Sequence, residues 1–292
     1  MDVGKIVREM CRDEYFSHYL YKSLAKKLFI SSSMRSALEK AAEDEYRHYL
    51  FWKGVAGECS STLLKLKALF YTALFYLFGL TVLLKYLESK EKVATEVYRE
   101  LAKKRPDIED VIERIAIDEE RHESVFLSGL DEGRVRYIGS ITLGISDALV
   151  ELTGIYTGSL GAFESTLSAG LAGFLAGIAA SISMGIASYA QAKNEGRARP
   201  GLAALYTFLA YIAVALLLAL PYFIISSLLA AFIVMLILAV TVVAYMAFYV
   251  AVLQNRSYLR EFIEATLLIF GVSILLYTIG SVLGNVLGVK VY

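Results

Sequence analysis

The sequence predicts an all-α protein in which a four-helix bundle is followed by a membrane domain of five helices. Two observations carry this prediction. The 292 residues are 57% apolar with a mean hydropathy of +0.55, which is too apolar for an ordinary soluble protein. Charged residues of both signs are dense up to Arg136 and sparse after it. We therefore expect a polar domain at residues 1–132 and a membrane domain at 133–292.

The polar domain is expected to contain four helices. Residues 31–33 are serines, which suit the start of the second helix because a hydroxyl accepts a hydrogen bond from a free backbone N–H of the first turn. Pro106 ends the third helical run, because proline cannot continue a helix but fits the first turn of the next one. The expected helices cover about 3–30, 34–57, 61–104 and 107–129.

The uncharged stretch from Ala68 to Leu84 makes the third helix unusual. It is slightly shorter than the ~20 apolar residues that a membrane span needs. A span here would put the glutamates before it and those after it on opposite sides of a bilayer. We therefore expect a buried or membrane-surface helix, which could also pack against a second subunit. A true span is the alternative.

Two Glu-x-x-His pairs contain two of the three histidines of the chain: Glu45 with His48, and Glu119 with His122. Residues three apart lie on one face of a helix, so each pair points a carboxylate and an imidazole the same way. Four-helix bundles that hold two metal ions use two such pairs and one glutamate from each of the other two helices. The pairs therefore predict a two-metal site in the polar domain.

Spacing indicates which glutamates complete this site. Glu14 precedes Glu45 by the same number of residues as Glu88 precedes Glu119, so the domain consists of two hairpins of one design. Glu91, one turn after Glu88, is a candidate extra ligand. The alternative is a charged bundle with solvated Glu–His contacts, which a single pair would favour but a repeated pair does not. The predicted metal ligands are Glu14, Glu45, His48, Glu88, Glu91, Glu119 and His122.

The predicted ligand set constrains the metal. Carboxylates and imidazoles suit Fe²⁺, Mn²⁺ or Zn²⁺, and six of them suit a bridged pair of ions. We expect a di-iron site, with Mn²⁺ or Zn²⁺ as alternatives. His18 has no matching glutamate and is expected to be a packed or surface histidine. Cys11 and Cys59 form no Cys-x-x-Cys motif, and we expect separate buried thiols in a reducing compartment.

Five apolar segments follow the polar domain, and the connections between them alternate between basic and non-basic. By the positive-inside rule, this pattern predicts a multi-pass protein of the cell membrane, with a cytoplasmic N-terminal domain and an outside C-terminus. The first residues lack the apolar region of a cleaved signal peptide, and no basic arm suggests a nucleic-acid partner. The expected spans cover about 137–157, 167–190, 202–223, 227–252 and 265–287.

Three residues of the membrane domain are candidates for a transport path. Asp147 and Glu151 are four residues apart in the first span and share a face. An ionisable group near the bilayer centre costs at least ~2.5–3.5 kcal/mol, so it usually marks an ion or proton path. The alternative for Glu151 is a neutral structural role. Met184 lies among small residues in the second span, where its thioether could contact a metal or simply fill space.

These residues carry a resemblance to two known families. Residues 1–130 resemble a rubrerythrin-type ferritin-like domain. Residues 134–292 resemble the vacuolar iron transporter family in two segments, Tyr137-Ile-Gly-Ser-Ile-Thr-Leu-Gly-Ile-Ser-Asp-Ala-Leu-Val-Glu-Leu-Thr-Gly154 and Ala179-Ala-Ser-Ile-Ser-Met-Gly185. The second resemblance places the transport aspartate of that family on Asp147 and its transport methionine on Met184.

The resemblance implies a homodimeric five-span carrier that moves ferrous iron out of the cytosol in exchange for protons. The sequence departs from the family at Ser188, where a glutamate often stands, and the Cys-rich centre of rubrerythrin is absent. That absence argues against a self-contained peroxidase. Two alternatives remain open: a membrane-anchored di-iron ferroxidase or peroxide-scavenging enzyme, and a metal sensor that gates the carrier.

Overall fold

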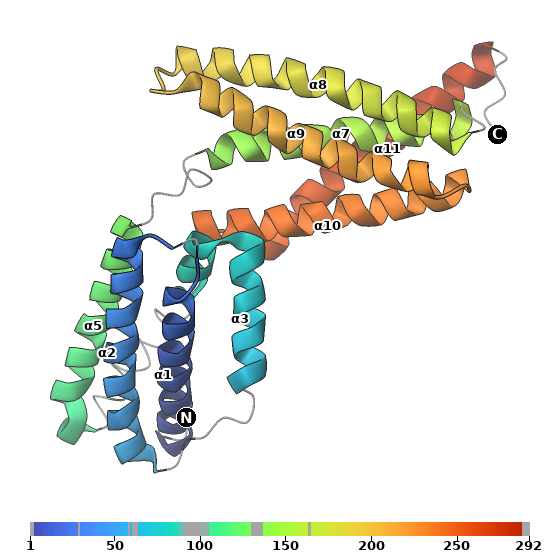
Figure 1. The fold of residues 1–292 in the computed structure, drawn as a ribbon. Coiled ribbons are helices and arrows are strands. Elements are labelled where there is room, and N and C mark those ends of the chain that lie inside the picture. Colours follow the sequence, from blue (N-terminus) through green and yellow to red (C-terminus); the bar gives the residue numbers. More distant parts are fainter. Residues whose placement is uncertain are drawn as a thin grey trace. The chain divides into compact units, whose positions relative to one another are not determined.

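The computed structural model describes residues 3–28, 30–57, 59, 64–87, 89, 101, 105–129, 137–162 and 165–287. Among these residues every regular element is a helix and there is no strand, so the predicted all-α class is confirmed. Packing divides the chain into two units, Met1–Glu132 and Gly133–Tyr292 (Figure 1).

The first unit is built around the antiparallel pair of α1 (Val3–Ala25) and α2 (Ser32–Ala56), which pack along most of their length. Pro106–Ile108 forms a short 3₁₀ turn, η1, that leads into α5 (Glu109–Gly129) beside α2 (Figure 1). Ser31 caps α2 as expected, because its Oγ accepts a hydrogen bond from the backbone N–H of Met34 at 3.3 Å. The first helix ends at Ala25, earlier than the expected residue 30.

The prediction of one continuous helix over 61–104 is wrong, because the helix is interrupted at Gly79. α3 (Leu64–Phe78) ends there because Gly79 has a φ of 85°, a left-handed conformation that glycine adopts easily, and helical structure resumes over 80–87. α3 is apolar but too short to count among the membrane-capable helices. It buries Phe75 against α1 and α2 and exposes large apolar side chains on its other face, among them Leu69 and Phe70.

A disulfide contradicts the expectation of two separate thiols. Cys11 of α1 is joined to Cys59, which follows α2, with the two Cα atoms 6.1 Å apart. Both residues are buried. The expectation failed because the cysteines are distant in sequence, and only the antiparallel packing of α1 and α2 brings them to the same end of the bundle.

The second unit contains the five membrane-capable helices, α7 (Ile138–Ala162), α8 (Thr166–Asn194), α9 (Pro200–Ile224), α10 (Leu228–Gln254) and α11 (Tyr258–Leu287). α9 lies at its centre, packed against α7, α8 and α10 (Figure 1). Large apolar side chains are exposed on the outer faces, such as Leu175 at 62% and Leu267 at 67%. This is the distribution expected of helices that face lipid.

α7 and α9 approach each other closely at Gly144. A Cβ atom at this glycine would lie 2.4 Å from the backbone carbonyl oxygen of Thr207, so no larger residue fits without a backbone shift. The buried Thr207 side chain joins three helices, because its Oγ1 lies 2.8 Å from Ser188 Oγ on α8 and 3.1 Å from the Ser140 carbonyl oxygen on α7. The crossing therefore fixes the helix face that carries Asp147, one turn further along α7.

Gly144→Ala should destabilise the second unit by about 1–3 kcal/mol, the usual cost of overpacking a well-packed core. Gly139→Ala is the matched control on the same helix, since a Cβ there would meet nothing within 4 Å. Thermal unfolding in detergent, followed by circular dichroism, measures the difference. Equal melting temperatures for the two variants would mean that α7 and α9 do not pack this tightly.

Candidate metal centre

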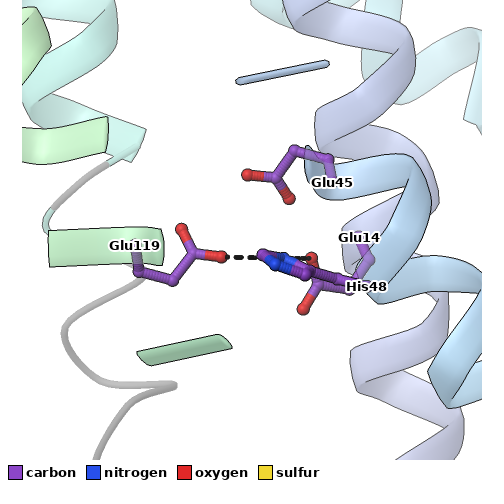
Figure 2. A group of neighbouring side chains, drawn as sticks. All are labelled: Glu14, Glu45, His48 and Glu119. Carbon is purple, nitrogen blue, oxygen red and sulfur yellow. Dashed lines mark ion pairs between the residues drawn. The ribbon is translucent and has the colours of Figure 1, made fainter. Parts of the chain in front are cut away.

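Four buried side chains converge in the core of the first unit. Glu14 comes from α1, Glu45 and His48 from α2, and Glu119 from α5. One ligand atom of each lies within 4.8 Å of the corresponding atoms of the other three. Figure 2 shows the Glu119 carboxylate directed at His48, with Glu14 and Glu45 facing the same centre. The Nδ1 atom of His48 is 3.5 Å from Glu14 Oε2 and 3.4 Å from Glu119 Oε1.

His122 joins this cluster from α5. Its Nδ1 atom lies 3.4 Å from Glu45 Oε1 and 3.7 Å from Glu119 Oε2, and the side chain is buried. The structure thus brings together five of the side chains named as candidate ligands from the sequence. Glu88 and Glu91 lie outside the described residues. His18 lies apart from the cluster and donates a hydrogen bond from Nδ1 to the Ala42 carbonyl oxygen at 2.6 Å.

The donor atoms of the cluster fit a metal. The Nδ1 atoms of both His48 and His122, together with Glu119 Oε2, are buried and have no hydrogen-bond partner among the described residues. Burying polar atoms without partners costs free energy, which a bound cation would offset. Mixed carboxylate and imidazole donors suit Fe²⁺, Mn²⁺ or Zn²⁺. These residues would therefore hold the ions and keep water from them.

Two aspartates that the sequence analysis missed orient the histidines. His48 Nε2 donates to Asp118 Oδ2 at 3.2 Å, and His122 Nε2 donates to Asp44 Oδ2 at 3.1 Å. Each histidine is thus held by the aspartate that precedes the glutamate of the other pair. This fixes the tautomer that leaves Nδ1 free to bind a metal. The signal was present in the sequence, because both motifs read Asp-Glu-x-Arg-His.

Arginines complete this outer layer. Arg121 reaches both aspartates, at 2.7 Å from Asp44 Oδ2 and 2.8 Å from Asp118 Oδ1, and Arg47 pairs with Asp44. Burial would raise the pKa of Asp44, but the hydrogen bond from His122 and the charges of Arg47 and Arg121 outweigh it and lower that pKa below its usual value. Asp44 therefore stays ionised and continues to accept from His122.

Asp44→Asn should weaken metal binding about 10–100-fold, the usual effect of losing a carboxylate that orients a ligand. Asp13→Asn is the control, because Asp13 is exposed and pairs with Lys67 on the surface. Competition with a fluorescent chelator measures both affinities. If the two variants bind metal equally well, the aspartate does not position His122.

The charge state of His48 couples metal binding to pH. Burial would lower the pKa of this imidazole, but the carboxylates of Glu119 and Glu14 outweigh that effect and raise the pKa to about 10 in the metal-free protein. A metal can bind only the neutral ring, so binding at neutral pH must displace a proton. The folded pKa also exceeds the unfolded value of about 6.5. The stabilisation from the protonated ring is therefore complete below pH ~6.5 and is lost as pH rises through about 10.

Metal affinity and metal-free stability should consequently respond to pH in opposite directions. We expect the affinity to rise with pH between 6 and 8 and proton release to accompany binding. Isothermal titration calorimetry in buffers of different ionisation enthalpy measures the protons released. Binding without proton release would contradict the protonated state assigned to His48.

The candidate transport residues lie in the second unit. Asp147 and Glu151 are both half-buried on α7, and Glu151 Oε2 accepts a hydrogen bond from Tyr211 of α9 at 2.7 Å. Tyr211 is fully buried, so it holds Glu151 in place from within the unit. Met184 of α8 is half-buried and packs against the core of this unit. Tyr211 could not be found from the sequence, because no local pattern connects it to Glu151.

The family match found for this chain covers the first unit. The rubrerythrin family model matches residues 5–130. No curated protein and no solved structure matches the chain. The whole cluster of described ligands and its supporting aspartates lie inside the matched segment. The chain therefore carries a rubrerythrin domain with a di-iron-like centre, followed by five helices that can span a membrane.

Proposed function

We propose that the protein is a membrane transporter that exports ferrous iron, or manganese, from the cytosol in exchange for protons. The bundle captures the metal on the cytoplasmic side, and the five-helix unit carries it across the cell membrane. The observation that supports this most is the buried carboxylate and imidazole cluster in a chain that also has five membrane-capable helices. A rubrerythrin domain joined to such helices fits a membrane iron-handling protein.

The transport step is assigned to α7. Asp147 and Glu151 place two carboxylates on one face of an apolar helix, where a metal ion can exchange with protons. That face is only half-buried within one chain. A second copy packed against it would enclose the path, so we propose a homodimer. Met184 would contribute a soft ligand along the path.

Flux into proteoliposomes tests the proposal. The purified full chain is reconstituted with a fluorescent chelator inside, and Fe²⁺ kept reduced by ascorbate is added outside. We expect uptake faster than in protein-free vesicles, and faster again when the lumen is acidic and protons can leave in exchange. Mn²⁺ serves as a redox-inert second cargo. Uptake no faster than in protein-free vesicles, from protein shown to bind metal, would reject transport.

A second candidate function is a membrane-anchored ferroxidase or peroxide scavenger. The buried cluster favours it, because the same ligands that capture Fe²⁺ can hold a redox-active pair of ions. Oxygen or peroxide consumption on addition of Fe²⁺, without metal flux, distinguishes this enzyme from the transporter.

A further inference from the structure

The Cys11–Cys59 pair lies beside the candidate metal centre. Cys11 precedes Glu14 by one helical turn on α1, so the sulfur and the carboxylate share a face. Both cysteines belong to a buried apolar cluster with Trp52 of α2 and Ile115 of α5. The pair is therefore part of the bundle core and not a surface crosslink.

Two residues that pack with the cysteines show how near the disulfide lies to the metal centre. Trp52 follows His48 by one turn on α2, and Ile115 precedes Glu119 by one turn on α5. A helix rises 1.5 Å per residue, so the cysteine layer and the ligand layer are about 5 Å apart along the bundle axis. On the three described helices α1, α2 and α5, the cysteine layer and the ligand layer are therefore consecutive.

Burial limits which reagents can reach the sulfurs. Cys11 is 0% exposed and Cys59 is 4% exposed, so large thiol or disulfide partners are excluded from the folded bundle. The chain has two cysteines, and both are in this pair, so no third thiol can resolve or exchange the bond. Only small molecules that enter the core, such as peroxide or a short dithiol, would reach the sulfurs.

We propose that Cys11 and Cys59 form a two-electron redox couple that serves the metal centre. In the reduced state the two thiols supply the two electrons that reduce one hydrogen peroxide molecule, a reaction that metal ions held by Glu14, His48 and Glu119 would promote. The O–O bond breaks, the S–S bond forms, and the two thiol protons end on the two water molecules released. A small external dithiol restores the thiols. This inference rests on metal capture at the centre as proposed above, but it is independent of transport.

The test counts free thiols in the wild-type full chain. The protein is reduced with dithiothreitol, desalted without oxygen, and divided into a metal-free sample and one loaded with Fe²⁺ and checked for bound metal. Each receives a small excess of peroxide, is quenched in acid, and is alkylated for intact-mass analysis. We expect the metal-loaded sample to fall from two free thiols per chain to none. It should do so more than ~10-fold faster than the metal-free sample, because buried thiols are otherwise inert.

A control variant and the flux assay show whether the redox couple, transport or metal binding has failed. Asp13→Asn, loaded with Fe²⁺, should oxidise its thiols like the wild type, since this surface carboxylate is not part of the centre. Equal oxidation rates with and without bound metal, or a disulfide that resists reduction in the folded protein, would overturn the inference and leave a structural crosslink. Metal-dependent thiol oxidation without flux in proteoliposomes would support the inference while rejecting transport. A chain that binds no metal would reject both.

Discussion

Replacing Glu119 by glutamine is expected to abolish tight metal binding at the candidate centre. Among the described residues, this carboxylate lies beside both histidines, with Oε1 3.4 Å from His48 Nδ1 and Oε2 3.7 Å from His122 Nδ1. Glutamine keeps the size of the side chain but removes the negative charge that would help to hold the cations. We expect the affinity to fall by more than the ~100-fold that marks the upper range for residues that only orient a ligand.

The loss of metal binding should also remove the stabilisation that bound metal gives to the folded protein. A ligand present at 100 times its dissociation constant stabilises a folded protein by ~2.7 kcal/mol, so metal should raise the melting temperature of the wild type but not of the variant. Elemental analysis of the purified protein gives the metal content directly. Glu120→Gln is the matched control, since this neighbour is exposed on α5. Wild-type metal content in Glu119→Gln would mean that the ions sit elsewhere.

Replacing Asp147 by asparagine is expected to reduce metal flux at least ~10-fold while leaving metal binding by the bundle unchanged. The aspartate belongs to the second unit, whereas the described ligands belong to the first, so capture and transport should fail separately. An amide cannot carry the proton that is exchanged, and it attracts a cation less strongly than a carboxylate does. The measurement is the initial rate of Fe²⁺ uptake under a pH gradient.

Ser146→Ala controls for general disturbance of α7, because Ser146 is the exposed neighbour of Asp147. The control should transport at the wild-type rate. Undiminished flux in Asp147→Asn would remove this residue from the path and leave Glu151, held by Tyr211, as the remaining carboxylate on that face. Loss of flux in both variants would instead indicate that any change in this turn of α7 disturbs its packing.

Local periodicity was enough to place most helices and to group the histidine ligands. The Glu-x-x-His spacing puts two donors on one helix face whatever the rest of the chain does, and two such pairs are what a two-metal bundle uses. The supporting pairs were harder to predict. His48 bonds to Asp118 and His122 to Asp44, and each pair joins residues from different hairpins. No rule of local spacing reports which side chains meet across a bundle.

The break in the third helix could not be predicted from composition. A long apolar run with good helix formers predicts one helix, but a single glycine with a positive φ ends α3 at Phe78. Glycine inside an apolar run is tolerated in many helices, so its presence alone did not mark a break. Phe75, one turn before Gly79, packs into the core of the first unit, so α3 stays against the bundle up to the break.

The chain alone determined the features that depend on local order and composition: the all-α class, the apolar helices after the polar domain, and the helix faces that carry glutamate, histidine and aspartate. Only the tertiary structure decided which distant residues touch, namely the disulfide and the crossed histidine–aspartate pairs in the first unit and the Tyr211–Glu151 bond in the second. The reason is physical. Helix periodicity follows from backbone geometry within a few residues, whereas contacts across a core follow from how whole helices pack.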